Sequence, residues 1–127
     1  LDFELRIAAP KAYQPCPELI AKAGGKIMVT DDCNTAAEGA DLLYTDVWIS
    51  MGMEEEGAQR ESDFTGYQIN EALVAKANEN ALVMHCLPAY RGKEIDESTL
   101  EAHAETIFTQ AENRLHAQKS ILKWLTE

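Results

Sequence analysis

Five short apolar runs, separated by segments with helical spacing, constrain the fold of this chain more than any other feature. Strands are expected over residues 1–9, 26–30, 41–48, 81–86 and 106–108. Helices are expected over residues 18–23, 35–38, 66–78, 97–103 and 110–125, with an irregular loop over residues 50–65. Because strands that alternate with helices at short spacing pair in parallel, the pattern predicts an α/β fold with a doubly wound parallel sheet in three layers.

The composition excludes several classes of protein. The 127 residues suffice for one domain, and the net charge of −11 argues against nucleic acid or an anionic membrane as the main partner. Three cysteines without C-x-x-C spacing predict neither a disulfide framework nor a metal site, and favour a reducing, cytoplasmic location. No apolar run approaches the roughly 20 residues of a membrane span, and no G-x-G-x-x-G or Walker A motif indicates a nucleotide.

A histidine and a cysteine follow the apolar run of residues 81–84, and Pro88 then ends the strand. Ligands of open α/β sheets bind outside the carboxyl ends of the strands, so His85 and Cys86 are candidates for a site. Each also has a simpler interpretation. A cysteine is commonly a small buried hydrophobe, and a histidine here is commonly a core residue with its hydrogen bonds satisfied.

Two further candidates are an aspartate and an arginine. Asp46 follows the third expected strand and is either a turn cap or a carboxylate that recognises a cation. Arg114 is expected in the first turn or two of the last helix, where a cation opposes the helix dipole. It is therefore either the ion-pair partner of Glu112 or another acid, or part of an anion site at the helix N-terminus.

Three motifs together resemble the ornithine carbamoyltransferase family, over nearly the whole chain and in the family's order. They are Asp-Val-Trp-Ile-Ser-Met-Gly at 46–52, His-Cys-Leu-Pro-Ala-Tyr-Arg-Gly at 85–92 and Gln-Ala-Glu-Asn-Arg at 110–114. The Ser-Met-Gly loop is the specific part, because it separates the ornithine enzymes from relatives that carbamoylate aspartate or putrescine.

The resemblance implies transfer of a carbamoyl group from carbamoyl phosphate to the side-chain amine of L-ornithine, giving L-citrulline and phosphate. It implies no metal and no organic cofactor. By resemblance, Asp46, Ser50 and Met51 bind ornithine, and Cys86, Leu87 and Arg114 bind carbamoyl phosphate. Asp46, Cys86 and Arg114 are then the catalytic residues.

Other family motifs are not found in this sequence. They include the phosphate-binding Ser-x-Arg-Thr-Arg and His-Pro-x-Gln motifs, and a Gly-Asp-x-Asn-Asn strand expected just before Leu1. Residues 1–127 are therefore expected to be a fragment: an ornithine-binding, Rossmann-like domain that lacks its first strand. The carbamoyl phosphate domain, with the surfaces that form a homotrimer, would belong to the rest of the protein. The alternatives are a non-catalytic binding or scaffold relative, and an independent flavodoxin-like module.

Overall fold

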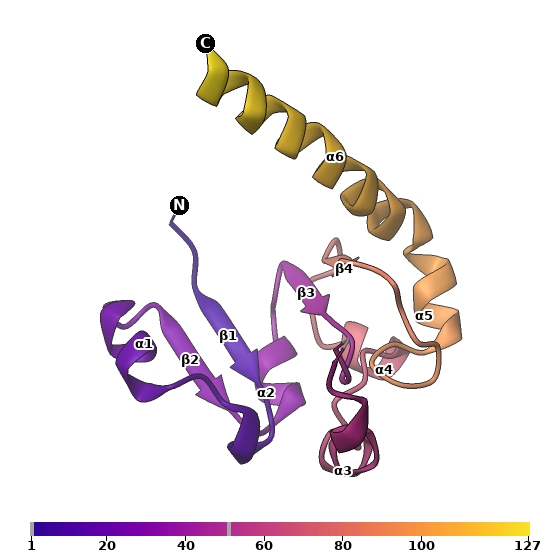
Figure 1. Cartoon of the computed structure of the whole chain (residues 1–127). Coiled ribbons are helices and arrows are strands. Elements are labelled where there is room, and N and C mark those ends of the chain that lie inside the picture. The colour runs from indigo at the N-terminus through magenta and orange to yellow at the C-terminus, as the bar shows by residue number, and fades with distance from the viewer. Residues whose placement is uncertain (1, 51) are drawn as a thin grey trace.

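The computed structural model describes residues 2–50 and 52–127, and it has the expected α/β architecture with parallel strands (Figure 1). The strands are β1 (Leu5–Ala8), β2 (Ile27–Thr30), β3 (Leu42–Thr45) and β4 (Leu82–His85). The α-helices are α1 (Pro17–Lys22), α2 (Cys33–Ala37), α3 (Gly57–Asp63), α4 (Glu71–Val74), α5 (Glu97–Ala102) and α6 (Ala104–Thr126). Two 3₁₀ turns, η1 (Lys11–Tyr13) and η2 (Glu54–Glu56), complete the described elements.

The four strands form two parallel pairs rather than one continuous sheet. β1 pairs with β2, and β3 pairs with β4 in a register that sets Leu43 opposite Val83 and Thr45 opposite His85. Across the molecule the order is β2, β1, β3, β4, with β1 and β3 in separate sheets (Figure 1). In a doubly wound sheet the first strand is central and pairs with a strand on each side. The separation of β1 and β3 into two sheets therefore agrees with a Rossmann-like sheet that lacks its first strand.

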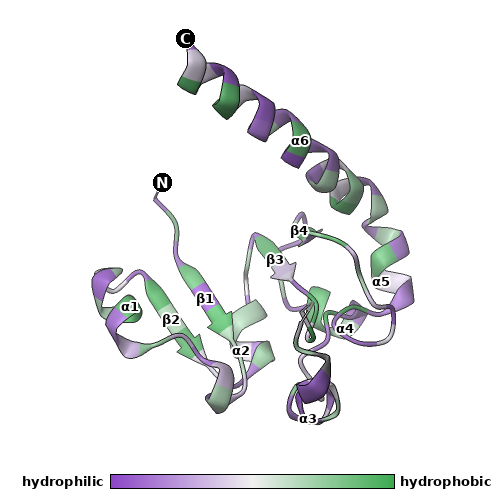
Figure 2. Ribbon diagram, in the orientation of Figure 1, coloured by the Kyte–Doolittle hydropathy of each residue, from purple (hydrophilic) through white to green (hydrophobic). Residues whose placement is uncertain are grey.

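The core lies where β3 and β4 meet the helices. Residues alternate along β3, so that Leu42 and Tyr44 are exposed while Leu43 is buried. The other members of this buried cluster are Ala37, Ile69, Val83, Ile95, Leu100 and Ile107. Burial of each large aliphatic side chain stabilises the fold by about 1.5–3 kcal/mol. Hydrophobic residues run along the strands, whereas α6 alternates between hydrophobic and hydrophilic positions (Figure 2).

The strand expected at residues 106–108 is wrong, because these residues belong to α6. Ile107 is fully buried while Phe108 is more than half exposed, and α6 packs against β4. A short apolar run does not distinguish a strand from a buried helical turn, and no glycine or proline interrupts residues 104–126. The helix therefore begins well before Gln110, where the sequence pattern had placed its start.

The segment after β3 is more ordered than an irregular loop. It contains η2 and α3. Aromatic contacts hold the end of α3, since the ring centroid of Phe64 lies 4.8 Å from that of Tyr13 and 6.0 Å from that of Trp48. The helix expected over residues 66–78 is shorter than predicted, since only α4 forms there, with the Asn70 side chain capping it. Asp32 caps α2, because its side chain accepts hydrogen bonds from two backbone N–H groups of that helix.

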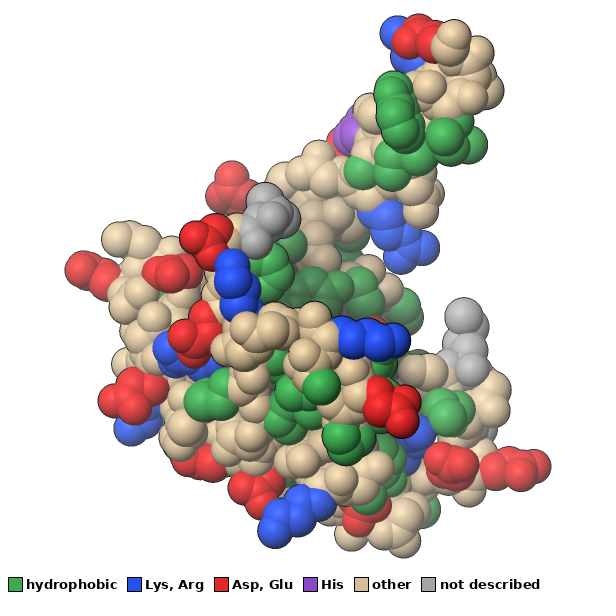
Figure 3. Space-filling model, turned by 90° about the vertical axis from the view of Figure 1, so that its left-hand side faces the viewer, with side chains coloured by type: hydrophobic (Ala, Val, Ile, Leu, Met, Phe, Trp, Pro, Cys, Tyr) green, Lys and Arg blue, Asp and Glu red, His purple; other side chains and the backbone are tan. Residues whose placement is uncertain are grey.

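The C-terminal part of α6 stands away from the body of the molecule, with hydrophobic side chains gathered towards its end (Figure 3). Its exposed apolar residues are Leu115, Ile121, Leu122, Trp124 and Leu125. Among the described helices, none is long and apolar enough to cross a membrane.

Candidate functional site

Asp46 and Cys86 meet at the carboxyl ends of β3 and β4. Because Thr45 and His85 are paired in register, the next residue of each strand lies beside the other. The Cys86 thiol donates a hydrogen bond to Oδ1 of Asp46, with Sγ and Oδ1 3.1 Å apart. The same oxygen accepts from the backbone N–H of Val47 at 2.7 Å. Asp46 thus serves as a turn cap and also presents a carboxylate at the strand ends.

This environment keeps the Cys86 thiol protonated. Burial raises the pKa of Cys86 above its usual value, and the hydrogen bond to Asp46 and the charge of that carboxylate raise it further. A thiolate would be repelled by Asp46, whereas a neutral thiol can donate to it. Cys86 is therefore a hydrogen-bond donor near neutral pH rather than a nucleophile or a base.

Arg114 lines one cleft together with Cys86, although it is not at a helix start. It lies ten residues beyond Ala104, the first residue of α6, so the interpretation based on the helix dipole is wrong. The ion pair considered with Glu112 is also not found among the described residues; Oε1 of Glu112 lies 3.6 Å from Nε2 of His116 instead. Arg114 makes no ion pair within the part of the chain that the structure describes.

Polar side chains line the cleft between Cys86 and Arg114. Tyr44 and Gln110 meet there, with Nε2 of Gln110 donating to the Tyr44 hydroxyl at 3.2 Å, while the buried Oε1 of Gln110 has no hydrogen bond from the described residues. The remaining lining residues are Ala111, Asn113 and Ala117. Arg114 is the one cation among the described residues of this cleft, which could therefore hold a small anion.

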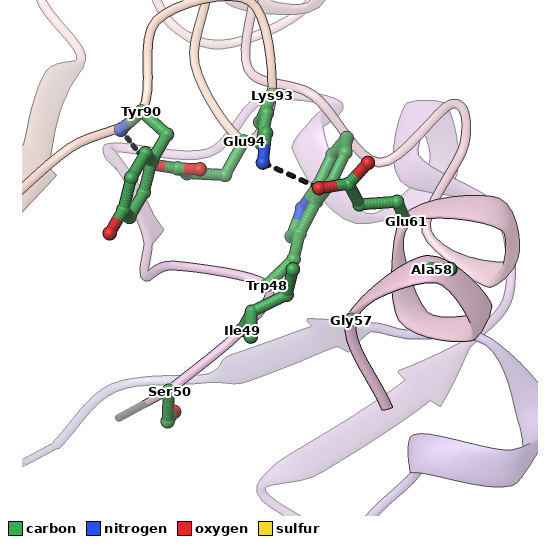
Figure 4. Close-up of a pocket in the computed structure, with 9 residues that line it drawn as sticks. All are labelled: Trp48, Ile49, Ser50, Gly57, Ala58, Glu61, Tyr90, Lys93 and Glu94. Carbon is green, nitrogen blue, oxygen red and sulfur yellow. Dashed lines mark hydrogen bonds and ion pairs between the residues drawn. The ribbon is translucent and has the colours of Figure 1, made fainter. Parts of the chain in front are cut away.

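Ser50 lies on a different cleft from Cys86 and Arg114. That cleft runs between the segment after β3, α3 and the turn after β4 (Figure 4). Trp48, Ile49 and Ser50 form one wall, and the ion pair between Lys93 and Glu61 joins the turn to α3. Met51, the other residue expected to bind ornithine beside Ser50, lies outside the described residues.

His85 and Leu87 form the turn that leaves β4. His85 is fully buried and both its ring nitrogens are used, Nδ1 by the N–H of Leu87 at 2.9 Å and Nε2 by Oε1 of Glu94 at 3.1 Å. The interpretation of His85 as a satisfied core histidine is confirmed. A carboxylate oxygen of Asp46, a ring nitrogen of His85 and Sγ of Cys86 lie within 4.8 Å of one another, close enough to be considered as ligands of a metal ion. Both nitrogens of His85 are, however, already engaged in these hydrogen bonds.

Sequence reasoning missed three residues of this region: Tyr44, Gln110 and Glu94. Tyr44 could have been found, because it is two positions before Asp46 and so faces the same side of β3. Gln110 could not, since its contact with Tyr44 depends on α6 starting earlier than expected. Glu94 reads as an ordinary loop acid, and only the structure shows that its side chain is buried.

The sequence matches a known family over nearly its whole length. Residues 1–125 match the family described as "Aspartate/ornithine carbamoyltransferase, Asp/Orn binding domain". The chain belongs to this carbamoyltransferase family. The resemblance inferred from the three motifs is thereby confirmed, whereas the roles of the individual site residues remain predictions.

Relatives within the carbamoyltransferase family agree in sequence and in fold. An ornithine carbamoyltransferase of Halorhodospira halophila is 50% identical over 98% of this chain and 42% of its own length. One from Sulfurovum sp. is 48% identical over 100% of this chain and 44% of its own length. A crystal structure of an anabolic ornithine carbamoyltransferase from Campylobacter jejuni superposes with a TM-score of 0.90 at 40% identity, over 98% of this chain and 43% of that one. The chain thus spans less than half the length of these relatives.

Proposed function

We propose that this chain supplies the ornithine-binding side of an enzyme that transfers a carbamoyl group from carbamoyl phosphate to L-ornithine, giving L-citrulline and phosphate. The observation that carries the proposal is the meeting of Asp46 and Cys86 at two strand ends, with Arg114 on the same cleft. Relatives about 50% identical that are named ornithine carbamoyltransferase support it.

The chemistry of the acceptor amine fits this pair of side chains. An alkylamine like that of lysine has a pKa of about 10.4, so it must lose a proton before it can attack the carbamoyl carbon. The Asp46 carboxylate would hold the amine by charge and hydrogen bond. Because the raised pKa of Cys86 keeps its thiol neutral, Cys86 would orient Asp46 and the amine and not take the proton. The proton would pass to Asp46 or to the leaving phosphate.

The phosphate end of the donor substrate calls for fixed positive charge. Arg114 is exposed and has no ion-pair partner among the described residues, so its guanidinium is free to bind two phosphate oxygens. Main-chain groups of Cys86 and Leu87 would meet the carbamoyl group. Positive charge placed where negative charge develops lowers the barrier of such a transfer. Ser50 and Met51 would hold the α-amino and carboxylate groups of ornithine as their loop closes.

The remaining parts of the site would come from the rest of the protein. We assign residues 1–127 to an ornithine-binding domain, with a carbamoyl phosphate domain and a homotrimer in the complete enzyme. The net charge of −11 supports small-molecule substrates rather than nucleic acid or an anionic membrane. The three free cysteines support a reducing location such as the cytoplasm.

The experiment is a citrulline assay on the complete protein that carries this chain. Purified protein receives carbamoyl phosphate with ornithine, aspartate or putrescine, and each carbamoylated product is measured. Of the three acceptors, only ornithine is expected to be carbamoylated. Binding of both substrates without any product would instead identify a non-catalytic relative, and product from aspartate or putrescine would contradict the assigned acceptor.

A further inference from the structure

A buried carboxylate controls the turn that carries Leu87. Glu94 and His85 are both fully buried, and Nε2 of His85 lies 3.1 Å from Oε1 of Glu94. The same oxygen accepts the backbone N–H of Tyr90 at 2.6 Å. Glu94 therefore ties the end of β4 to the far side of the turn through a single oxygen atom. Its second oxygen, Oε2, is buried without a hydrogen bond from any described residue.

The hydrogen bonds fix which nitrogen of His85 carries the proton. Leu87 donates its backbone N–H to Nδ1, so Nδ1 must offer a lone pair. Nε2 then carries the hydrogen and donates it to Glu94. A buried carboxylate that accepts from one ring nitrogen sets the tautomer and the orientation of the ring. Through His85, Glu94 thereby determines where the N–H of Leu87 points.

The backbone of Leu87 needs such support. Its φ of 56° lies in the left-handed region, and Leu87 is the one residue other than glycine with positive φ in the described chain. A side chain with a Cβ atom disfavours this conformation, which persists only where the surroundings hold it and which is common at functional sites. The hydrogen bond from the Leu87 N–H to Nδ1 of His85 holds its backbone here, while its side chain packs against the core.

We propose that Glu94, acting through His85, is a positioning residue for carbamoyl transfer that fixes the main chain of Leu87 against carbamoyl phosphate. The inference rests on the proposed function. It adds to that function two fully buried residues and a chain of two hydrogen bonds that ends at the main chain of Leu87. An ordinary core pair would stabilise the fold without affecting substrate binding, and this difference is measurable.

Two substitutions of His85 separate positioning from stability in the complete protein. In His85→Asn the amide oxygen lies near the place of Nδ1 and can still accept from Leu87. In His85→Gln the longer side chain reaches the place of Nε2 and leaves the N–H of Leu87 without its acceptor. Both variants lose the ring and should lose similar thermal stability. We expect His85→Gln to lose roughly ten- to a hundredfold in kcat/KM for carbamoyl phosphate, because small misplacements near the chemistry are that costly. His85→Asn should lose less than His85→Gln, because it keeps an acceptor for the N–H of Leu87 although its link to Glu94 is lost.

Two substitutions of Glu94 repeat the test, and they decide the question if the His85 variants do not fold. Glu94→Gln keeps an oxygen for the N–H groups of His85 and Tyr90, whereas Glu94→Met removes it. We expect Glu94→Met to weaken the binding of carbamoyl phosphate, measured by calorimetry, by roughly tenfold or more, and Glu94→Gln to restore most of it. Ile95→Val is the control, since it trims the neighbouring buried side chain without touching either hydrogen bond.

The outcomes are distinct. If the unmodified protein forms no citrulline, the proposed function fails, and this inference fails with it. If the protein is active but each pair of variants shows equal kinetics and equal affinity for carbamoyl phosphate, the inference alone is overturned. It is also overturned if Ile95→Val loses as much activity as Glu94→Met at similar stability, because His85 and Glu94 would then be core residues only.

Discussion

The Cys86 thiol at the end of β4 donates a hydrogen bond to the Asp46 carboxylate at the end of β3, and this contact links two residues 40 positions apart in the chain. Parallel pairing is the cause, because it brings the carboxyl ends of both strands to the same edge. The contact makes the titration of one residue depend on the charge of the other.

The first prediction concerns alkylation of Cys86 as a function of pH. Burial and Asp46 raise the pKa of this thiol, so half-maximal alkylation by iodoacetamide should occur at a higher pH than for a cysteine in an unfolded peptide. Because the pKa of Cys86 is higher in the folded than in the unfolded protein, this thiol also contributes to the free energy of unfolding. That contribution is fully present below the unfolded pKa and is lost as the pH rises through the folded pKa. Mass spectrometry of the labelled peptide gives the rate at each pH.

Asp46→Asn should shift the alkylation curve of Cys86 to lower pH, because it removes the negative charge beside the thiol. The control is Asp41→Asn. Asp41 immediately precedes the first residue of β3, at the end of the strand away from Cys86, and its carboxylate accepts a hydrogen bond from the side chain of Asn78. An identical curve in all three proteins would show that the Asp46 carboxylate does not act on Cys86 in solution.

The second prediction concerns substrate recognition in the complete protein. Asp46→Asn should weaken ornithine binding far more than carbamoyl phosphate binding, since Asp46 is proposed to hold the amine. Loss of a charge-assisted hydrogen bond at a desolvated site costs about 1.5–3 kcal/mol, or roughly ten- to a hundredfold in affinity. Steady-state kinetics with each substrate varied provide the measurement, again with Asp41→Asn as the control. Equal losses for both substrates would remove ornithine recognition from the role of Asp46.

The meeting of Asp46 and Cys86 could be predicted from sequence because it follows from local patterns. Each residue ends an apolar run, and parallel strands bring such ends together without knowledge of distant packing. The strand expected at residues 106–108 was wrong because the local pattern there is too short. Three apolar or β-branched residues carry no period long enough to distinguish strand from helix, and packing of Ile107 against the core decides the matter.

The buried Glu94 and the contact of Gln110 with Tyr44 could not be predicted from sequence. An acid in a polar turn is normally solvated, and only the fold of the turn over residues 85–94 brings two N–H donors to one oxygen of Glu94. Gln110 reaches Tyr44 across 66 positions of sequence, through the placement of α6 on the sheet. Tertiary contacts of this kind leave no local signal.

The third prediction concerns Arg114, whose position in the middle of α6 removes the argument from the helix dipole and leaves the argument from its cleft. In the complete protein, Arg114→Lys should lose at least about tenfold in kcat/KM for carbamoyl phosphate, because a point charge cannot reproduce the guanidinium fork. Arg91→Lys is the control, since Arg91 forms surface ion pairs with Glu97 and Glu101. Near-full activity of Arg114→Lys would make Arg114 a surface residue.

The last prediction is that the 127-residue chain alone forms no citrulline. Holding two reactants in line supplies up to roughly 7–11 kcal/mol of catalysis, and this requires groups on both sides of the reacting atoms. Of the described residues that line the cleft at Cys86, Arg114 alone carries positive charge, so phosphate would bind weakly there. The chain also spans only 42–44% of the length of its relatives.

The test of this prediction uses the chain with and without a separately expressed amino-terminal part of the complete protein. The facing edges of β1 and β3 belong to separate sheets, so the chain alone should also be marginally stable or self-associate. Citrulline formed only on mixing would support a site divided between the two parts, and a shift to one larger species in gel filtration should accompany it. Turnover by the chain alone would contradict the prediction, because a single side of the site would then be sufficient for the chemistry.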